Sequence, residues 1–315
     1  MPRTLTFVEA INEALQIAMS DDPGVICFGL GIDDPKAIFG TTSGLKDRFG
    51  SERVWDMPTS ENAMTGIAIG AALQGMRPVM VHQRLDFFLL AMDQLINNAA
   101  KWHYMFGGQR SVPLTIRLIL GRGWGQGPTH SQSLHAWFAH IPGLKVVMPT
   151  SPEDAKGLLL ASIADPNPVL FLEHRWLHNT TGNVPAGNTP IPIGTARLLR
   201  EGTDITIVAM SYMVIEALHA VDHLKNAGIS CDLIDLRSIS PIDWNAITAS
   251  VHKTGRMLVL DTGSLTGSLA GVAVLVSRRG GMQAALPFGT FLAVGALVAA
   301  VGGDAILDWY LQFYR

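Results

Sequence analysis

Three observations predict an α/β protein with two doubly wound domains. Short apolar segments alternate along the chain with segments of helical periodicity, and this alternation is typical of parallel sheets covered by helices. The 315 residues are enough for two domains of the common size, about 100–200 residues each. A segment rich in Asn, Gly, Thr and Pro, residues 179–192, divides the alternating series in two. We therefore expect a first domain over residues 1–185 and a second over residues 193–267, followed by an apolar tail over residues 268–315.

In the first domain, helix starts and apolar strands follow one another in order. Thr6 and Ser151 are suitable N-caps, because their hydroxyl groups can accept hydrogen bonds from the first helical turn. The predicted helices cover residues 6–19, the stretch after Glu61, residues 82–106 and the stretch after Ser151. The predicted strands cover residues 25–28, 79–81, 114–120, 144–148 and 169–173. The loops after such strands, residues 29–35 among them, form the edge where open parallel sheets usually bind ligands.

The second domain repeats the same alternation on a smaller scale. Apolar strands are predicted over residues 203–210, 230–236 and 257–261. A helix over residues 212–226 connects the first two strands, and a short helix after Pro241 precedes the third. This order indicates a second doubly wound domain.

Composition and charge argue against several classes of function. The net charge of −3 at pH 7 and the pI of about 6.3 provide no basic field, which argues against nucleic acid as a partner. Cys27 and Cys231 are too few and too far apart for a disulfide framework, and they fit a reducing cytosol. Arg3 and Glu9 lie where a signal peptide would have an apolar run, so we expect a cytoplasmic protein.

The tail differs from the rest of the chain in its hydropathy. Residues 282–303 carry no charge, with Arg278 and Arg279 before them and Asp304 after them. This length meets the roughly 18–20 residues of a membrane span, and aromatic residues follow near one end. A buried pair of terminal helices would have the same composition. The sequence therefore leaves two alternatives for the tail, a membrane span and a segment packed on the domain.

Glu61 is the leading candidate for chemistry in the first domain. It stands at the start of a helix of small and aliphatic residues, in which Gly66, Gly70 and Ala71 leave one face nearly bare. Such a face lets another helix pack closely, and a second subunit is the best source for that helix. A carboxyl group partly removed from water can stay protonated and donate a hydrogen bond. The alternative is that Glu61 is only an acid favoured by the helix dipole.

A second concentration of polar residues follows the strand over residues 114–120. The loop has glycines at alternate positions, but Gln126 stands where a Gly-x-Gly-x-x-Gly motif needs its third glycine, and no Gly-Lys-Ser/Thr follows. We therefore exclude a nucleotide-binding loop. His130 has hydrogen-bonding neighbours on both sides and can act as an acid, a base or an anion contact. The alternative is a loop histidine with no chemical role.

Two further groups of polar residues are weaker candidates for metal sites. His135 and His140 have no Cys or Glu at ligand spacing, which argues against zinc. The turn from Asp165 to Asn167 is expected to be structural, although its oxygens could bind a hard cation.

Several longer motifs occur in a fixed order along the chain. They are Pro58-Thr-Ser-Glu61, Gly70-Ala-Ala-Leu-Gln-Gly-Met-Arg-Pro78, Asp93-Gln-Leu-Ile-Asn-Asn-Ala-Ala-Lys101, His130-Ser-Gln132, Pro142-Gly-Leu-Lys-Val-Val147 and Asp232-Leu-Ile-Asp-Leu-Arg-Ser-Ile-Ser-Pro241. With these motifs, residues 1 to about 267 resemble the beta subunit of the thiamine-diphosphate-dependent 2-oxoacid dehydrogenases. That family has a transketolase-like pyrimidine-binding domain followed by a transketolase C-terminal-like domain.

The resemblance assigns roles to residues that match the motifs of the family. It implies that Glu61 hydrogen-bonds the aminopyrimidine ring of thiamine diphosphate and promotes deprotonation of the thiazolium carbon. Phe87 matches the aromatic residue that stacks on the pyrimidine, and Gln83 is also assigned to cofactor binding. His130 matches the histidine that contacts the substrate or assists acyl transfer to a lipoyl group. Asp165 and Asn167 match a structural loop that can hold potassium.

The resemblance also implies that this chain holds only half of an active site. The magnesium-diphosphate motif of the family, Gly-Asp-Gly followed by Asn-Asn, is absent from the sequence. We therefore expect an alpha subunit to bind Mg²⁺ and the diphosphate in an α2β2 heterotetramer. The substrate is expected to be a small 2-oxoacid, and the acyl acceptor a lipoyl-bearing acyltransferase.

The sequence departs from the family at several positions. Leu30 stands where the family commonly has a carboxylate, and Arg84 and Trp124 are unusual near the expected pocket, which suggests a substrate other than pyruvate. From Ser268 onward the family pattern stops, so the second domain is expected to be truncated. The tail is similar to the last transmembrane stretch of type IV prepilin leader peptidases, over residues 286–297, without the catalytic aspartates of those enzymes.

The leading hypothesis is thus a beta subunit that takes part in decarboxylating a 2-oxoacid on thiamine diphosphate and passing the acyl group to a lipoyl acceptor. Two alternatives stay open. The chain could be a non-catalytic or membrane-tethered scaffold that keeps the fold, or a transketolase-like carboligase that uses the same cofactor.

Overall fold

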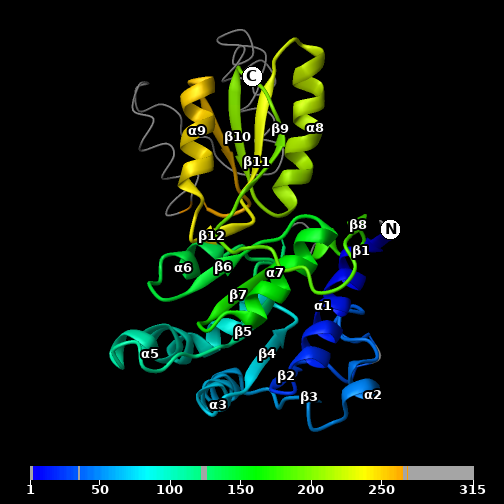
Figure 1. Cartoon of the computed structure of the whole chain (residues 1–315), viewed down its shortest axis with the longest axis vertical. Helices are drawn as coiled ribbons and strands as arrows, with labels where there is room; N and C mark the ends of the chain where they lie inside the picture. The colour runs from blue at the N-terminus through cyan, green and yellow to red at the C-terminus, as the bar shows by residue number, and fades with distance from the viewer. Residues whose placement is uncertain (1–2, 35, 122–125, 265–267, 269–315) are drawn as a thin grey trace.

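The computed structural model describes residues 3–34, 36–121, 126–264 and 268, and these residues form two α/β domains (Figure 1). The predicted fold class is confirmed. The tail, with the expected membrane span over residues 282–303, lies outside the described residues. Among the helices that are described, none is long and apolar enough to cross a membrane.

The first domain is organised around a sheet with seven strands among the described residues, in the order β12-β6-β7-β5-β4-β2-β3. All neighbouring strands run parallel except β12, which pairs antiparallel with β6. The strands are β2 (Val25–Gly29), β3 (Val54–Asp56), β4 (Arg77–His82), β5 (Thr115–Leu120), β6 (Lys145–Val147), β7 (Val169–His174) and β12 (Ser238–Ser240). Every residue of β2 is buried, which explains why this strand reads as an uninterrupted apolar run.

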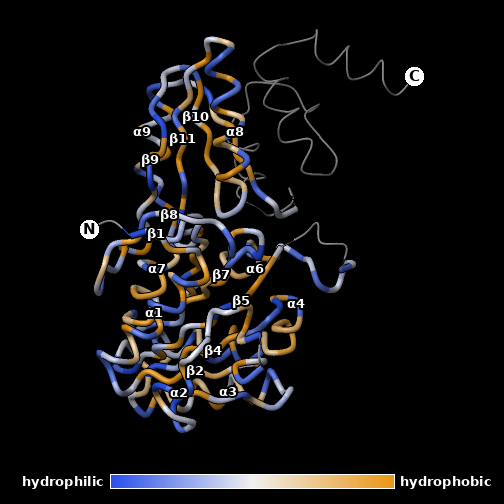
Figure 2. Tube along the Cα trace, turned by 90° about the vertical axis from the view of Figure 1, so that its right-hand side faces the viewer, coloured by the Kyte–Doolittle hydropathy of each residue, from blue (hydrophilic) through white to orange (hydrophobic). Residues whose placement is uncertain are grey.

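Helices cover both faces of this sheet, because successive strand residues point to opposite sides. Val25 and Cys27 face α1 (Phe7–Asp21) and α7 (Pro152–Ala164), whereas Ile26 and Phe28 belong to the core on the other face. That second face is covered by α3 (Glu61–Leu73), α4 (Leu85–Phe88), η1 (Leu89–Ala91), η2 (Gln94–Ala99), α5 (Ala100–Met105) and α6 (His135–Ala139). Figure 2 shows the apolar residues along β5 at the centre of the domain.

The predicted helix starts at Thr6 and Ser151 are confirmed. Thr6 forms a capping box with Glu9, and the Ser151 hydroxyl accepts a hydrogen bond of 3.1 Å from the Asp154 amide. The prediction of a single helix over residues 82–106 is wrong at its start. His82 still belongs to β4, and the helical segments begin only at Leu85 and include a π-helical turn.

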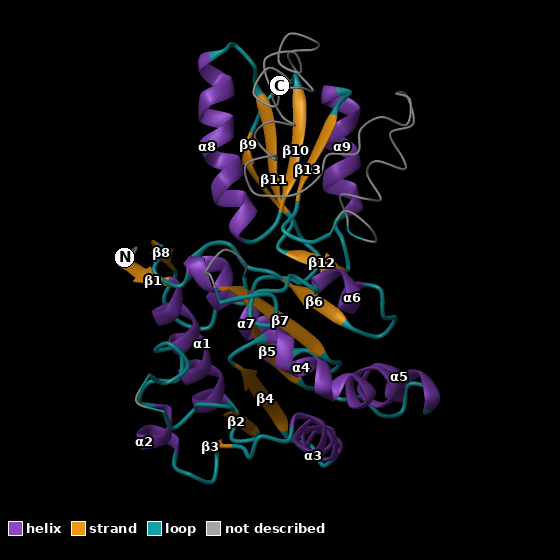
Figure 3. Cartoon of the chain, turned by 180° about the vertical axis from the view of Figure 1, so that it is seen from behind, coloured by secondary structure: helices purple, strands orange, loops and turns teal. Residues whose placement is uncertain are grey.

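The second domain contains a sheet whose four described strands have the order β13-β10-β11-β9 (Figure 3). Its strands are β9 (Arg197–Arg200), β10 (Ile205–Ala209), β11 (Cys231–Asp235) and β13 (Met257–Leu260). Helix α8 (Tyr212–Asn226) packs on one face, and α9 (Trp244–Thr254) lies on the other (Figure 3). The helix predicted over residues 212–226 therefore has the expected bounds.

The segment that divides the two predicted domains contains a strand. Within residues 179–192, β8 (Thr181–Val184) pairs antiparallel with β1 (Arg3–Thr6) at the start of the chain. The two domains are also joined by side chains. The Asp261 carboxylate lies 2.8 Å from His135 Nε2, and Arg237 forms an ion pair of 2.7 Å with Asp154. Short helices α2 (Leu45–Phe49) and η3 (Arg175–Leu177) complete the described elements.

Candidate functional site

A cavity of about 790 Å³ opens beyond the carboxyl ends of β2 and β4. Its walls come from the loop after β2, the start of α3, the segment from β4 to α4, and the loop after β5. Glu61, Gln83, Phe87 and His130 all line it. The structure thus brings together four residues that the sequence analysis selected in three separate segments.

Glu61 is the first residue of α3 and is almost completely buried, with 5 % of its surface exposed. The Thr65 hydroxyl donates a 2.8 Å hydrogen bond to the Glu61 backbone carbonyl, one helical turn back. The Glu61 carboxylate accepts no hydrogen bond from any residue that the structure describes. An acidic group at the cavity wall therefore has its hydrogen-bonding capacity available for a ligand.

Phe87 and His130 form the aromatic part of the site. Their ring centroids lie 5.2 Å apart with the planes nearly perpendicular, and Phe87 is 40 % exposed. The loop that carries His130 is attached to α4, because the Asp86 carboxylate accepts hydrogen bonds from the backbone amide and the side-chain amide of Gln132, at 3.2 and 2.8 Å. The Thr129 hydroxyl lies 3.1 Å from His130 Nδ1.

Gln83 approaches the backbone of the loop after β2. A Cβ atom at Gly31 would lie 2.0 Å from the Gln83 side-chain nitrogen, and Gly31 has a φ of +84°. A side chain at position 31 would therefore be strained and would displace Gln83. This glycine allows the Gln83 amide to lie against the wall of the cavity.

His82 lines the same cavity and was not selected from the sequence. It is completely buried at the end of β4, and its ring lies edge-on to Phe88 with centroids 4.9 Å apart. Neither ring nitrogen has a hydrogen-bond partner among the described residues. Burial lowers the pKa of His82 to about 3, so the imidazole is neutral at physiological pH. An unpaired buried polar group at a cavity wall is costly, which is a feature of functional sites.

Asp165 and Asn167 do not line this cavity. They lie between α7 and β7, where the Asp165 carboxylate accepts a 2.9 Å hydrogen bond from the Asn167 amide and pairs with Lys145. The Arg77 guanidinium donates to the carbonyl oxygens of Ile163 and Asp165, at 3.0 and 3.4 Å. These oxygens already face two cations, so potassium does not fit here without displacing one of them.

His135, for which zinc was considered unlikely, pairs with Asp261 instead. Burial raises the pKa of the Asp261 carboxyl, but the charge of His135 and the hydrogen bonds from His135, Gly263 and Thr262 together lower it below its usual value. In the part of the chain that the structure describes, no group of three or more His, Cys, Asp or Glu side chains could hold a metal ion.

The cavity can bind a planar heteroaromatic ring. Phe87 provides an aromatic face on which such a ring can stack. The Glu61 carboxyl group and the Gln83 amide provide hydrogen bonds for its polar edge, and His130 can transfer a proton. The described residues that line this cavity also include two cations, Lys36 and Arg84.

Family models and curated relatives agree on where this chain is similar to known proteins. Residues 3–180 match the model of the transketolase pyrimidine-binding domain, and residues 194–298 match that of the transketolase C-terminal domain. The chain is 46 % identical over 263 residues to the pyruvate dehydrogenase E1 component subunit beta-2, mitochondrial, from Oryza sativa subsp. japonica. That alignment covers 82 % of this chain and 70 % of the relative.

Two bacterial proteins show similar levels of identity. The beta subunit of acetoin:2,6-dichlorophenolindophenol oxidoreductase from Cupriavidus necator is 43 % identical, over 84 % of this chain and 81 % of its own length. The 2-oxoisovalerate dehydrogenase subunit beta of Bacillus subtilis is 41 % identical, over 87 % of this chain and 85 % of its own length.

Solved structures support the fold. A split-gene transketolase, described as an inactive beta4 tetramer, superposes with a TM-score of 0.71 at 21 % identity, over 88 % of this chain and 86 % of that chain. Transketolase from Leishmania mexicana gives a TM-score of 0.66 at 18 % identity, over 83 % of this chain and 39 % of that chain.

Proposed function

We infer the function of this chain from its family, because it belongs to the transketolase-like beta subunits of the thiamine-diphosphate-dependent 2-oxoacid dehydrogenases. It is an oxidoreductase subunit that acts on a 2-oxoacid together with an alpha subunit. The observation that supports this function in the structure is the meeting of Glu61, Gln83, Phe87 and His130 in one cavity.

The described residues fit the pyrimidine half of thiamine diphosphate. Phe87 is exposed enough to stack on a ring, and the Glu61 carboxylate beside it is available for hydrogen bonding. When bound, the cofactor supplies a carbon acid that adds to the keto group and an electron sink for the electrons left by departing carbon dioxide. In this proposal Glu61 exchanges a proton with the ring, and Gln83 fixes the position of the ring edge.

We assign His130 to the substrate side of the cavity. Its ring is held against Phe87 and its loop is fixed through Asp86 and Gln132. An imidazole in this position can orient the keto oxygen of a 2-oxoacid or transfer a proton when the acyl group moves to a lipoyl acceptor. The lipoyl-bearing acyltransferase is part of this proposal.

The alpha subunit completes the site in this proposal. The sequence has no Gly-Asp-Gly motif, so Mg²⁺ and the diphosphate are assigned to the alpha chain. Exposed apolar residues lie on the neighbouring elements α3 and η1, where Ile67 is 58 % and Leu90 is 67 % exposed. Exposed apolar side chains beside a cavity favour a protein interface. Potassium at the turn from Asp165 to Asn167 is not included, because Lys145 pairs with the Asp165 carboxylate and Arg77 donates a hydrogen bond to the Asp165 backbone carbonyl.

The test compares turnover by the alpha–beta complex containing wild-type beta chain, Glu61→Gln or the control Glu201→Gln. Glu201 is exposed and distant in sequence from the cavity-lining residues. Thiamine diphosphate and Mg²⁺ are titrated, and release of carbon dioxide from a 2-oxoacid is measured. We expect Glu61→Gln to lose about 10²–10⁴-fold in kcat, the usual contribution of a general acid–base group. Equal turnover by Glu61→Gln and wild type would remove Glu61 from the mechanism.

The same preparation separates the two alternatives. Product analysis with and without a lipoyl acceptor distinguishes acyl transfer from a carboligase reaction. A scaffold that does not bind the cofactor would show no change in melting temperature when thiamine diphosphate and Mg²⁺ are added.

A further inference from the structure

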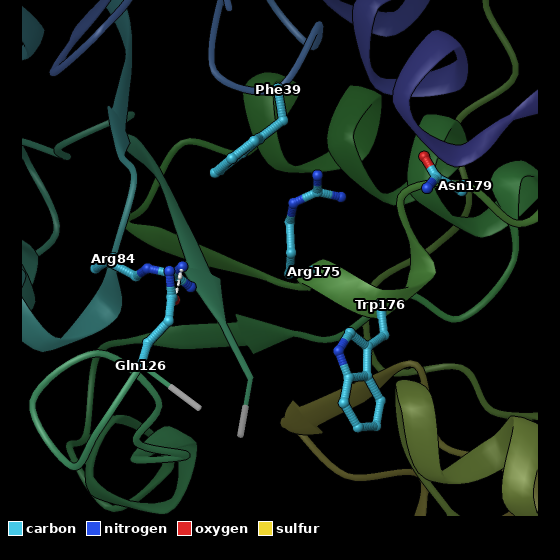
Figure 4. A pocket seen from close by; sticks show the side chains of 6 residues that line it. All are labelled: Phe39, Arg84, Gln126, Arg175, Trp176 and Asn179. Atoms are coloured by element: carbon cyan, nitrogen blue, oxygen red, sulfur yellow. Dashed lines mark hydrogen bonds between the residues drawn. The ribbon is translucent and has the colours of Figure 1, made fainter. Parts of the chain in front are cut away.

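A second cavity, of about 490 Å³, adjoins the site (Figure 4). Phe39, Arg84 and Gln126 line both cavities, and Arg175, Trp176 and Asn179 line only the second. A ligand whose reacting end lies beside Glu61 can therefore extend its other end into the second cavity. Both volumes are of the size that small-molecule sites commonly have.

The lining of the second cavity is positively charged. Its six described lining residues include two arginines and no carboxylate. Figure 4 shows the guanidinium groups of Arg84 and Arg175 on two sides of the space below the Phe39 ring. Arginine stays protonated in proteins, so two full charges face this space.

The carboxylates whose charges act on these arginines, Asp86 and Glu173, also have other partners. Asp86 accepts hydrogen bonds from Gln132, and Glu173 lies 2.8 Å from Arg117 and 3.4 Å from His178. Burial lowers the pKa of Arg84; Asp86 opposes this effect and the charge of Arg175 adds to it. Burial also lowers the pKa of Arg175, and Glu173 opposes it. The two guanidinium groups thus lie close enough for each charge to affect the other.

Specific contacts hold both arginines in place. The Arg84 guanidinium donates a hydrogen bond to the Gln126 side chain. The Arg175 guanidinium lies 4.3 Å from the Phe39 ring centroid, a cation–π contact. Phe39 itself ends a run of three non-glycine residues with positive φ, from 44° to 59°. Such a conformation costs about 1–2 kcal/mol per residue, and strained backbone of this kind is concentrated at ligand sites.

The chain on both sides of Arg175 is anchored to the second domain. The His174 ring stacks on Tyr212 with centroids 5.0 Å apart, and the Trp176 ring meets Tyr212 edge-on at 4.9 Å. Residue positions that are fixed in this way suit the recognition of a ligand group at a defined distance from the reacting centre.

We propose that the second cavity binds the distal carboxylate of the substrate, so that the 2-oxoacid is a dicarboxylic acid. This proposal rests on the proposed function. A carboxylate placed between Arg84 and Arg175 would offset the repulsion between their charges, and guanidinium groups match carboxylate geometry well. A monocarboxylic 2-oxoacid such as pyruvate has no group that reaches this space. The other anion with suitable chemistry is the diphosphate of the cofactor, which the test distinguishes.

The test uses the alpha–beta complex with thiamine diphosphate and Mg²⁺. Two probes of equal chain length, 2-oxoglutarate and 2-oxopentanoate, are compared with wild type, Arg175→Gln, Arg84→Gln and the exposed control Arg110→Gln. We expect wild type to favour 2-oxoglutarate. We expect each cavity variant to lose about 10- to 100-fold in kcat/KM for 2-oxoglutarate, the range for a hydrogen bond to a charged group. Arg175→Gln, whose arginine lines only the second cavity, should change less than about threefold with 2-oxopentanoate.

A binding measurement separates the failure of this proposal from the failure of the proposed function. Glutarate should raise the melting temperature of the wild-type complex and not that of Arg175→Gln, and pentanoate should raise neither. If no 2-oxoacid is turned over but glutarate raises the melting temperature in this way, the carboxylate site is supported and the proposed function is refuted. Preference of wild type for 2-oxopentanoate overturns the carboxylate site. So does an Arg175→Gln variant that needs more thiamine diphosphate but keeps its substrate preference, because the anion is then the diphosphate. If no 2-oxoacid is turned over and glutarate does not change the melting temperature, both the carboxylate site and the proposed function are refuted.

Discussion

Replacing His82 by leucine should make the protein more stable, although His82 lines the candidate site. The imidazole is completely buried, and both ring nitrogens lack a hydrogen-bond partner among the described residues. A buried polar group without a partner costs about 1–3 kcal/mol. Leucine removes this cost and keeps a side chain of similar volume beside Phe88. We therefore expect the free energy of unfolding at pH 8 to rise by about 1–3 kcal/mol.

The pH dependence of His82→Leu gives the sharper measurement. Burial lowers the pKa of His82 from 6.5 to about 3, so between these values the unfolded chain binds a proton that the folded chain does not bind. Above pH 6.5 the titration of His82 therefore does not change the stability of the fold, and as the pH falls from 6.5 toward 3 the stability decreases. Between pH 8 and pH 5 this loss amounts to about 2 kcal/mol, and the variant should not show it.

The assay is urea unfolding followed by circular dichroism at pH 8 and pH 5. The control is His219→Leu, which makes the same substitution at an exposed position of α8. His174, whose pKa burial lowers to about 4, contributes equally to wild type and to His82→Leu, so the difference between these two proteins isolates His82. Equal losses of stability in the two proteins between pH 8 and pH 5 would refute the reasoning.

Two further predictions concern the core and the assembly. Glu173→Gln should lower the free energy of unfolding by about 3–5 kcal/mol, because Arg117 then stays buried without its charge partner. Thermal unfolding measures this loss of stability. A loss below about 1 kcal/mol would contradict the prediction. Gly70→Ala should stabilise the isolated beta chain by about 0.5–1 kcal/mol, because a Cβ atom there meets no atom within 4 Å. If α3 packs closely on a partner helix, the same variant should weaken assembly with the alpha chain, which sedimentation measures. Unchanged assembly would argue against such packing.

Local signals in the sequence predicted much of the fold. The Thr6 capping box is encoded within four residues, and α8 could be bounded because its apolar spacing is regular and Gly228 follows it. The pairings between distant segments could not be read in this way. Strand β8 is formed because β1 lies beside it, and its own residues resemble a linker. Strand order depends on such contacts, which a single local window does not contain.

The candidate site was predictable in part for the same reason. The family resemblance identified Glu61, Gln83, Phe87 and His130, and the structure places them in one cavity, while their roles stay predictions. His82 was missed because it reads as the start of a helix, whereas its importance lies in complete burial without a partner. Burial of this kind is a property of the packed fold.

The second cavity shows how a sequence feature gains meaning from its neighbours. Arg84 was unusual in the sequence, but alone it indicated only that the substrate differs from pyruvate. Arg175 attracted no notice, because it lies 91 positions away and follows a strand that looked purely structural.

Under the proposed function, the exposed side of the site is where a partner subunit would act. Phe87, Leu90 and Ile67 are each at least 40 % exposed, and they lie at the cavity or on the adjacent elements η1 and α3. A ring bound between Phe87 and Glu61 would meet water on this side, and water weakens the electrostatic contacts on which proton transfer depends. A second protein surface over these apolar residues would exclude that water. In the proposed function the same partner supplies the site for Mg²⁺ and the diphosphate, because the sequence lacks the Gly-Asp-Gly motif. Under the proposed function, the apolar rim and the missing motif are both explained by one alpha subunit.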